Sequence, residues 1–464
     1  MIFAIPLLDA VAIARAILRG HGVEGTIAWI LAIIALPGLG AVIYLTMASP
    51  RVGTTTRRKI RATETLRQER SQGAAAVERG ALPATFRLAE ELTGLPATAG
   101  NRVEPLFDDD RAFEVIESAI RGARRSICAE YYMVRNDVTG RRFLGLLAEK
   151  AAAGVAVRFI HDAVGSAGID RLGLQELERK GGRAQAFLPL NPFRRRWSIH
   201  LRNHKKLVIV DGEVAFTGGM NVGDEYSGRS RRRGERFFRD THLELRGPVV
   251  QGLTQAFAED WFFSTREPLA LDEPQAPAAA AGTAGVAILT SGPDQEWNVS
   301  SHALFATIAK ARQRLWIATP YFIPDQPTLR ALVTAALSGV DVRILVPAVS
   351  DVSLARAAAR ASYLPLVDAG VRIFEYLPSM LHAKALVADS RTSLVGSANC
   401  DFRSFRLNFE LGVIIDDPRF AARLEARFEE YLEQSLEISL RALEERPLLL
   451  RLAYGAVRLL SPLL

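Results

Sequence analysis

The feature that most constrains this chain is a strand-like segment that occurs twice, each time with a histidine and a lysine two residues apart in an apolar run. The first copy is NHKKLVIVDGEVAFTGGMN, residues 203–221, and the second begins MLHAKALVADS, residues 380–390. Both copies follow the spacing His-x-Lys-x4-Asp, with His204, Lys206 and Asp211 in the first and His382, Lys384 and Asp389 in the second. Two matching copies indicate a duplicated unit rather than a chance motif.

The similarity extends upstream of both motifs. ARRSICAEYYMVRND at 123–137 aligns without gaps with ARQRLWIATPYFIPD at 311–325, and GVAVRFI at 154–160 corresponds to GVDVRIL at 339–345. Each half is predicted to run helix, strand, helix, strand and then the His-Lys strand, which is the pattern of an α/β sandwich. The period of about 180 residues is too long for a solenoid and indicates two tandem domains related by pseudo-two-fold symmetry.

The length of 464 residues allows two such domains plus appendages. The predicted division is a membrane anchor at 1–50, a basic juxtamembrane region and lead-in at 51–100, a first catalytic domain at 101–265, a linker rich in Ala and Pro at 266–285, a second catalytic domain at 286–436 and an amphipathic membrane-associated helix at 437–464.

The N-terminal anchor is predicted to hold one clear transmembrane helix. Residues 26–47 carry no charge over 22 residues, which is long enough to span a bilayer, and Pro37 is expected to kink the helix. Residues 1–18 are also apolar but include Asp9 and Arg15, so they are expected to form either a poor first span or an interfacial helix. Arginines crowd residues 51–70, which places the following domains in the cytoplasm by the positive-inside rule.

The C-terminal segment ERPLLLRLAYGAVRLLSPLL, residues 445–464, mixes leucines with arginines. This pattern favours an amphipathic helix on a membrane surface, and the alternative is a helix docked on the protein's own core.

The charge balance suggests an anionic partner. The net charge is +7, and basic residues gather on both sides of the first motif. The two groups are Arg194, Arg195, Arg196, Arg202, Lys205 and Lys206, and Arg229, Arg231, Arg232, Arg233, Arg236 and Arg239. An acidic membrane surface or a nucleic acid would fit this charge, and plain solvated loops are the alternative. Cys128 and Cys400 match no metal-binding spacing, so two reduced, buried cysteines and no metal or other cofactor are expected.

The motif residues suggest phosphoryl chemistry. Residues i and i+2 of a strand point to one face, so His204 projects with Lys206 and His382 with Lys384. One neutral imidazole can attack phosphorus while another gives a proton to the leaving oxygen. Only seven of the 58 basic residues are lysine, so two lysines at matching motif positions indicate that a compact ammonium is needed to bind phosphate. The five histidines without a repeat mate are interpreted as structural: His21, His161, His200, His242 and His302.

Supporting roles are predicted for seven further residues. Asp211 and Asp389 lie seven positions after their histidines, about 23 Å along a strand, and are expected to fix the strand end. The motifs GGMN and GSAN supply Asn221 and Asn399 as donors to the transition state, and Ser397 has only a glycine, Gly219, opposite it. Asp240 and Glu410 are candidate carboxylates that orient the histidines, without an assignment of which serves which.

These residues resemble the phospholipase D superfamily, whose signature is H-x-K-x4-D twice. Segments such as LRNHKKLVIVDGEVAFTGGMNVGDEY, FRDTHLELRGPVV, GSANCDFRSFRLNFELGV and the N-terminal AWILAIIALPGLGAVIYL are similar to the bacterial cardiolipin synthase branch nearly from end to end. The resemblance implies two tandem phospholipase D-like domains and a phosphatidyl-histidine intermediate. It further implies His204 as the nucleophile and His382 as the general acid and base, whereas the residues alone leave the two halves equivalent.

The expected activity is therefore that of a cardiolipin synthase, a phosphatidyltransferase that joins two phosphatidylglycerol molecules and releases glycerol. The expected place is the bacterial cytoplasmic membrane, with the catalytic domains facing the cytoplasm and no nucleic acid as partner. The sequence does not fix the second lipid substrate, because phosphatidylglycerol and phosphatidylethanolamine are both chemically reasonable donors, and it leaves the oligomeric state open. The alternatives are a hydrolase or nuclease of the same superfamily, or an inactive membrane scaffold, which two complete motifs disfavour.

Overall fold

The chain divides into two compact units, Met1–Ile60 and Arg61–Leu464. The computed structural model describes residues 4–18, 22–47, 59–61, 63–64, 83–107, 109–189, 201–228, 237–269, 279–295 and 297–459. Most of the two predicted basic groups, at 194–196 and 229–236, lies outside these described residues.

The N-terminal unit contains three packed helices: α1 (Ala4–Leu18), α2 (Gly22–Ala35) and α3 (Leu39–Met47). Small side chains let the helices approach closely around Ala12, Ala16, Ile33, Ala41 and Tyr44. The ring of Trp29 meets that of Tyr44 edge to face at 5.3 Å between centroids. These two aromatic residues therefore pack within the unit.

The predicted continuous helix over 26–47 is wrong. The chain turns at residues 36–38, because Pro37 cannot donate a helical hydrogen bond and Gly38 adopts a left-handed φ of 76°. Asp9 accepts a hydrogen bond from the Gly38 backbone N–H at 2.9 Å, which gives this charge of the first apolar segment a partner at the start of α3. Within the described ranges, no helix has both the length and the apolar character needed to cross a membrane.

The second unit is built on one long mixed sheet. The first half supplies β1 (Thr98–Leu106), β2 (Ser126–Tyr131), β3 (Ala156–Asp162), β4 (Arg183–Phe187), β6 (Lys206–Val210), β7 (Val214–Gly218) and β9 (His242–Arg246). The second half supplies β10 (Ala284–Ser291), β11 (Arg314–Ala318), β12 (Asp341–Pro347), β13 (Arg372–Tyr376), β15 (Ala385–Ala388), β16 (Thr392–Gly396), β17 (Asn408–Asp416) and β18 (Ser435–Glu437). β10 begins inside the predicted linker 266–285, so that linker ends before Ala284.

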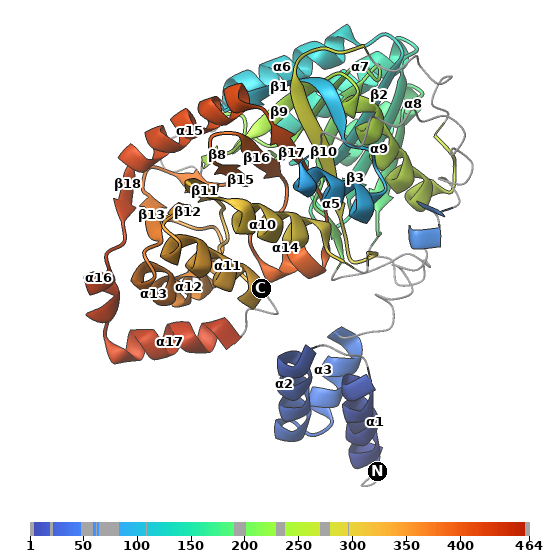
Figure 1. Ribbon diagram of the computed structural model, residues 1–464. Helices are drawn as coiled ribbons and strands as arrows, with labels where there is room; N and C mark the ends of the chain where they lie inside the picture. Colours follow the sequence, from blue (N-terminus) through green and yellow to red (C-terminus); the bar gives the residue numbers. More distant parts are fainter. Residues whose placement is uncertain are drawn as a thin grey trace. The chain divides into compact units, whose positions relative to one another are not determined.

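The strand order repeats about the centre of the sheet. Its path is β18-β13-β12-β11-β15-β16-β17-β10-β1-β9-β7-β6-β2-β3-β4, and the antiparallel pair β1–β10 joins the halves (Figure 1). Read outward from that pair, β9, β7, β6, β2, β3 and β4 match β17, β16, β15, β11, β12 and β13. The predicted α/β fold with two tandem repeats is confirmed.

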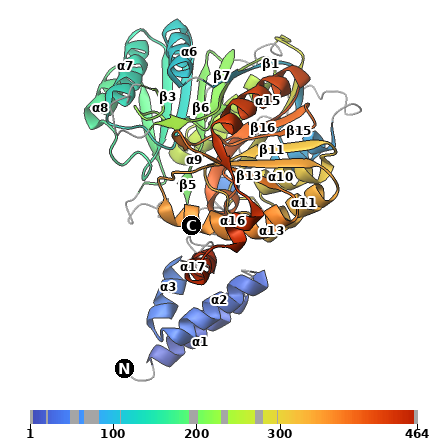
Figure 2. The same ribbon diagram turned by 90° about the vertical axis from the view of Figure 1, so that its left-hand side faces the viewer.

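Helices flank the strands of both halves. The first half has α5 (Ala84–Thr93), α6 (Asp109–Gly122), α7 (Val138–Ala152), α8 (Arg171–Arg179) and α9 (Val249–Thr265). The second half has α10 (Val299–Lys310), α11 (Gln326–Leu337), α12 (Ser353–Ala361), α13 (Tyr363–Asp368), α14 (Phe402–Arg406) and α15 (Pro418–Glu433). Helix α9 contacts β10, and α15 contacts β1 and lies across the second-half strands (Figure 2). Each of these helices thus reaches the strand that begins the other half.

Local sequence explains why the repeated elements form. Asp137 and Asp325, which end the aligned upstream segments, cap α7 and α11 by accepting hydrogen bonds from Gly140 and Thr328 backbone N–H groups. The motif strands β6 and β15 are buried at every position, as expected for strands covered on both faces. The motif strands therefore lie in the interior of each half.

The C-terminal segment forms two helices, α16 (Leu440–Glu444) and α17 (Leu448–Leu459), rather than one predicted helix over 437–464. Pro447 lies between them and removes a backbone donor. Strand β18, at Ser435–Glu437, pairs with β13 and so ties the start of this segment to the sheet.

Candidate active site

Each motif histidine is anchored by the backbone of the other half. The two-residue strand β5 (Arg202–Asn203) pairs in parallel with β17, and the backbone N–H of His204 donates to Phe409 O at 2.8 Å. In the same way β14 (Met380–Leu381) pairs with β8 (Phe238–Arg239), and the N–H of His382 donates to Arg239 O at 2.6 Å. The two motifs therefore lie at the boundary between the halves, where a short strand before each histidine pairs with a strand of the other half.

The carboxylate that contacts each histidine also comes from the opposite half. His204 Nδ1 lies 3.0 Å from Glu410 Oε2, and His382 Nδ1 lies 2.6 Å from Asp240 Oδ2. The sequence left this pairing open, and the structure pairs each imidazole with the carboxylate of the opposite half. A carboxylate acceptor at Nδ1 favours the proton on that nitrogen and leaves Nε2 as the basic position, which in His382 lies 3.0 Å from Lys384 Nζ.

The two carboxylates are supported differently. Glu410 accepts from Ser397 Oγ at 2.5 Å and from Asn408 Nδ2 at 3.1 Å. At the equivalent first-half position stands Gly219, where any Cβ would come within 2.0 Å of Asp240 Oδ1. The glycine therefore makes room for the shorter carboxylate, and the hydroxyl of Ser397 serves only the longer one.

The motif lysines are buried beside their histidines. Lys206 Nζ donates to the carbonyl oxygen of His204 at 2.6 Å, and Lys384 Nζ donates to that of His382. Burial lowers the pKa of Lys206 to about 7 and that of Lys384 to about 8. These ammonium groups have exchanged water for a few protein contacts, so a phosphate oxygen would be a strongly favoured additional ligand.

The electrostatics describe one site rather than two. Burial lowers the pKa of His204, and Lys384 of the other half lowers it further. Burial also lowers the pKa of His382 to about 4, with further lowering by Lys384 and by Lys206 of the other half. Both imidazoles are therefore neutral at pH 7 in the free protein.

The two carboxylates stay charged in the same surroundings. Burial raises the pKa of Asp240 and of Glu410, but the cationic and imidazole neighbours outweigh it and hold both pKa values below the ordinary range. Two anionic carboxylates thus stand ready to stabilise an imidazolium.

Aromatic side chains line both histidines. The Tyr132 ring lies 4.8 Å from that of His204, and Tyr226 and Phe238 lie 5.5 and 5.4 Å from His382. Sequence reasoning missed these three residues because the repeat carries no signal for them, and Tyr132 aligns with a proline.

The motif aspartates lie at the opposite end of their strands from the histidines. Asp211 accepts hydrogen bonds from the backbone N–H groups of residues 124–126, at 2.7 to 2.9 Å. Asp389 accepts from those of residues 312–314, at 2.8 to 3.1 Å. Both occupy the left-handed region, with φ of 55° and 52°. Each therefore fastens the strand end to the start of the aligned upstream segment of its own half.

The motif asparagines are engaged within the protein. Asn221 Nδ2 donates to the hydroxyl of Tyr226 at 2.9 Å, and the backbone N–H of Asn399 donates to Ser404 Oγ at 3.1 Å. Both amide oxygens are buried, and neither has a hydrogen-bond partner among the described residues. Their role as donors to a transition state stays a prediction.

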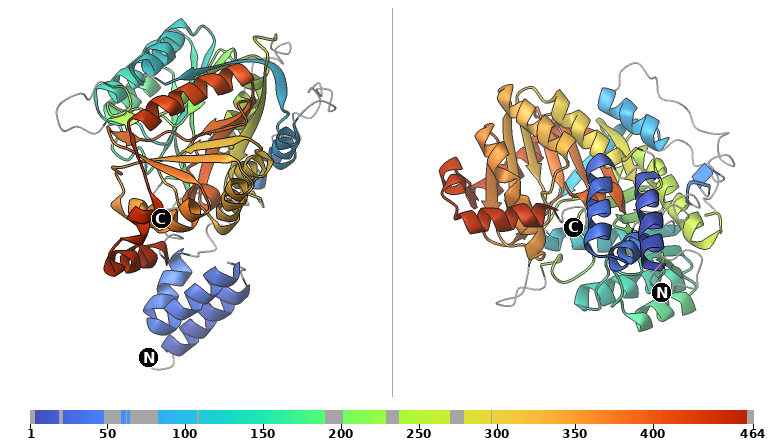
Figure 3. Two further views of the ribbon diagram at one scale, coloured as in Figure 1. Left: turned by 60° about the vertical axis from the view of Figure 1, so that its left-hand side comes forward. Right: turned by 90° about the horizontal axis from the view of Figure 1, so that it is seen from below.

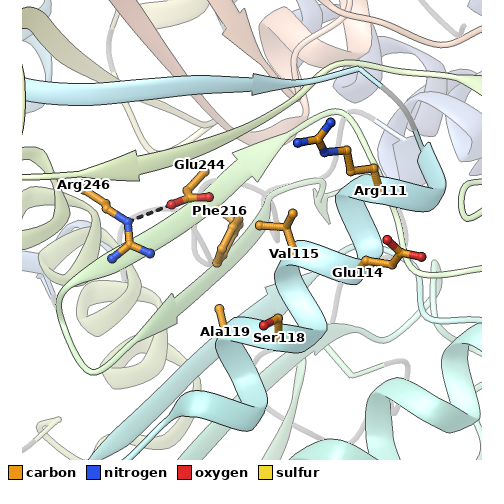
Figure 4. Close-up of a pocket in the computed structure, with 8 residues that line it drawn as sticks. All are labelled: Arg111, Glu114, Val115, Ser118, Ala119, Phe216, Glu244 and Arg246. Atoms are coloured by element: carbon orange, nitrogen blue, oxygen red, sulfur yellow. Dashed lines mark hydrogen bonds and ion pairs between the residues drawn. The ribbon is translucent and has the colours of Figure 1, made fainter.

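No group of His, Cys, Asp and Glu within the described ranges could hold a metal ion. Cys128 and Cys400 are buried free thiols, and burial raises the pKa of both, that of Cys128 to about 12. A hollow of about 360 Å³ lies between α6 and the sheet of the first half (Figure 4). Its lining includes Arg111, Glu114, Phe216 and the ion pair of Glu244 with Arg246, and none of the motif residues.

Two α/β repeats that share a sheet and exchange the partners of paired His-Lys motifs define an enzyme of the phospholipase D type. A family described as "Cardiolipin synthase, PLD-like domain" matches residues 116–261 and 304–432, and one described as "Phospholipase_D-nuclease N-terminal" matches residues 7–47. The chain belongs to the cardiolipin synthase family. This membership confirms the resemblance seen in the sequence and makes the chain a phosphatidyltransferase.

Curated relatives cover most of the chain. Cardiolipin synthase 2 of Bacillus anthracis is 41% identical over 381 residues, 82% of this chain and 74% of that protein. Cardiolipin synthase A of Pseudomonas fluorescens (strain SBW25) is 35% identical over 469 residues, 98% of this chain and 96% of that protein. Among solved structures, phosphatidylserine synthase of Haemophilus influenzae aligns with a TM-score of 0.62 at 16% identity, covering 82% of this chain and 100% of that one, which shows a shared fold.

Proposed function

We propose that this enzyme joins two phosphatidylglycerol molecules into cardiolipin and releases glycerol, with His204 as the nucleophile. The observation that carries the proposal is the crossed pair of imidazole–carboxylate hydrogen bonds, at 3.0 and 2.6 Å, beside two buried lysines. The relatives are named for this activity, and a hydrolase or nuclease is not favoured by them. The choice of His204 rests on the resemblance seen in the sequence.

In the first step, Nε2 of neutral His204 attacks the phosphorus of the donor lipid, and the P–O bond to the glycerol headgroup breaks. The leaving oxygen takes a proton from His382, whose pKa rises when the negative phosphate binds beside it. The new P–N bond makes the His204 ring cationic. Glu410, ionised and 3.0 Å from Nδ1, stabilises that charge.

In the second step, neutral His382 takes the proton from a primary hydroxyl of the second lipid. The resulting oxygen attacks phosphorus, the P–N bond breaks, and His204 returns to its neutral form. Lys206 and Lys384 hold the phosphate oxygens through both steps, and Asp240 stabilises the protonated His382. Phosphatidylglycerol is the proposed acceptor, since it supplies the hydroxyl. Phosphatidylethanolamine is the alternative donor in the first step, and it would be revealed by the release of ethanolamine in place of glycerol.

The enzyme is further proposed to act at the cytoplasmic face of the bacterial cytoplasmic membrane. The N-terminal unit exposes large apolar side chains, among them Leu7, Leu18 and Ile34, and basic residues follow it in the sequence. The lipid substrates reside in the same membrane.

One assay tests the reaction. Purified full-length protein with labelled phosphatidylglycerol in mixed micelles is expected to yield cardiolipin and glycerol in equal amounts. Phosphatidic acid without cardiolipin would replace the proposal with hydrolysis.

The assignment of the two histidines has its own test. A phosphatidyl ester of p-nitrophenol needs no acid to expel its leaving group. His382→Ala is therefore expected to release one equivalent of nitrophenol per enzyme, and His204→Ala to release none. The reverse result would exchange the two roles.

A further inference from the structure

Helix α17 has two apolar faces, and only one of them is covered within its unit. The helix runs along α12 on the outside of the second half (Figures 1 and 3). Tyr454 and Val457 face inward: the guanidinium of Arg446 lies 5.5 Å from the Tyr454 ring, and Val457 packs on Ile323, Ala355 and Ala358. This face packs against the second half, as the apolar face of an amphipathic helix in a soluble protein does.

The opposite face is also made of leucines. At 100° per residue, Leu448 and Leu452 point away from Tyr454 and Val457, and Leu449 lies at the side of the helix, about 80° around from Val457. The exposed fractions of Leu448, Leu449 and Leu452 are 68%, 80% and 60%. A helix whose outer face needed only water would carry polar residues there, so these leucines indicate a further apolar partner.

The chemistry of α17 favours a lipid surface as that partner. Its sequence, LLLRLAYGAVRL, contains two arginines and no acidic residue. Leucines together with arginines suit the boundary between the acyl chains and the anionic headgroups of a bilayer, where basic residues are attracted to the headgroups. The proposed substrate, phosphatidylglycerol, is itself an anionic lipid of that surface.

Packed side chains connect the inner face of α17 with the surroundings of His382. Tyr321 packs against the same cluster of Ile323, Ala355 and Ala358 as Val457 does, and its hydroxyl donates to Asp351 at 2.6 Å. Tyr321 also packs against the core that contains Tyr226 and Phe238, the aromatic neighbours of His382. The cluster of Ile323, Ala355 and Ala358, together with Tyr321, therefore connects the docked face of α17 with the core that contains the aromatic neighbours of His382.

We propose that α17 is an interfacial helix, whose outer leucines insert at the headgroup boundary and hold the His382 side of the active site at the surface from which lipids enter. This inference rests on the proposed function, because it assigns the surface from which the substrates of the same site arrive.

The test compares two substrates with one double variant in the full-length protein. Leu449→Ser/Leu452→Ser is expected to lower the rate on vesicles of phosphatidylglycerol and phosphatidylethanolamine about a hundredfold, the effect of removing two leucines from an apolar surface. On a short-chain phosphatidylglycerol kept monomeric in water, the rate should change less than about twofold. Leu172→Ser, which replaces a leucine on α8 that is 75% exposed, is the matched control and should leave both rates unchanged.

Each outcome decides one question. An unchanged rate on vesicles would overturn the interfacial role, and an equal loss on both substrates would place the leucines in folding or catalysis instead. If the unmodified protein made cardiolipin from neither substrate, the proposed function itself would fail.

A second measurement reports the partner directly. An environment-sensitive fluorophore on Leu449→Cys should shift to the blue when anionic vesicles are added, while one on Leu172→Cys should not. A shifted spectrum before any lipid is present would overturn the proposal, pointing to a second copy if the shift grows with protein concentration and to this chain's own N-terminal helices if it does not.

Discussion

The aspartate of the first motif offers a sharp test of the division between scaffold and chemistry. In Asp211→Asn, one of two carboxylate oxygens becomes an amide nitrogen, so at most two of the three backbone N–H groups of residues 124–126 keep an acceptor, and both lose the charge. Hydrogen bonds to an ionised acceptor contribute about 1.5–3 kcal/mol and neutral ones about half. We take the low end of both ranges because the site is partly exposed. Three charged hydrogen bonds are then replaced by two neutral ones, and the expected loss of unfolding free energy is about 3 kcal/mol.

The same change should barely touch catalysis. Seven residues along a strand place Asp211 about 23 Å from His204. Removing one charge at about 20 Å alters the energy at the site by about 0.2–0.8 kcal/mol, which is less than a fourfold change in rate. Asparagine also accepts the left-handed backbone of φ 55° at this position, so the strand keeps its course.

The assay pairs thermal unfolding, followed by near-ultraviolet circular dichroism in detergent, with initial rates on phosphatidylglycerol. The melting temperature should fall by about 4 °C for a unit of this size, with kcat nearly unchanged. Glu213→Gln is the matched control, a carboxylate of the same turn that is 65% exposed, and should change neither quantity. A hundredfold loss of kcat with an unchanged melting temperature would refute the reasoning and return Asp211 to the chemistry.

The pH dependence of that loss has a definite sign. The backbone N–H groups outweigh the effect of burial and hold the pKa of Asp211 below its ordinary value of 3.8. A lowered pKa stabilises the fold above the unfolded value and loses that effect as the pH falls through the folded value. The difference between Asp211→Asn and the parent should therefore be full at pH 7 and shrink below about pH 4.

Further expectations concern the reacting groups. Glu410→Gln should lower kcat at least about a hundredfold with little change in unfolding, because an amide cannot neutralise a cationic phosphohistidine, and a mild effect would contradict the step written above. kcat/KM should fall as the pH rises through about 7, where Lys206 loses its proton before Lys384 does, and Lys206→Arg should move that limb up toward about 8; an unmoved limb would assign it to another group. Gly219→Ser should abolish activity, since its Cβ would meet a carboxylate oxygen at 2.0 Å, whereas Ser397→Gly removes one hydrogen bond and should cost only about tenfold; equal effects would argue against the different support of the two carboxylates.

The sequence predicted what repeats along the chain. The duplicated spacing of histidine and lysine, with its aligned upstream segments, was sufficient for the two-repeat α/β fold and the family. It could not assign Asp240 and Glu410 to their histidines, because the ladders β5–β17 and β14–β8 join residues more than a hundred positions apart. Nothing in a local pattern records which half supplies the partner.

The error at the N-terminus has a different physical origin. Hydropathy over 26–47 measures only apolar content, whereas the path of the chain is decided by Pro37, by the left-handed Gly38 and by the hydrogen bond that the Gly38 N–H donates to Asp9 in another helix. In the sequence, Asp9 counted only as a charge that makes membrane insertion of the first apolar segment unfavourable. In the structure it accepts a hydrogen bond from the backbone at the start of α3.

The two proposed roles of the histidines require a difference between the halves that the exchange of partners alone does not supply. Each imidazole takes its backbone anchor and its carboxylate from the other half, so neither half holds a complete site. A perfectly symmetric exchange would leave His204 and His382 interchangeable. The symmetry is broken at the acceptors, where a glycine admits a short carboxylate beside His382 and a serine steadies a longer one beside His204. Roles in this site therefore depend on the residues behind the histidines, which makes the carboxylates and their supports the positions at which the order of attack and proton transfer can be changed.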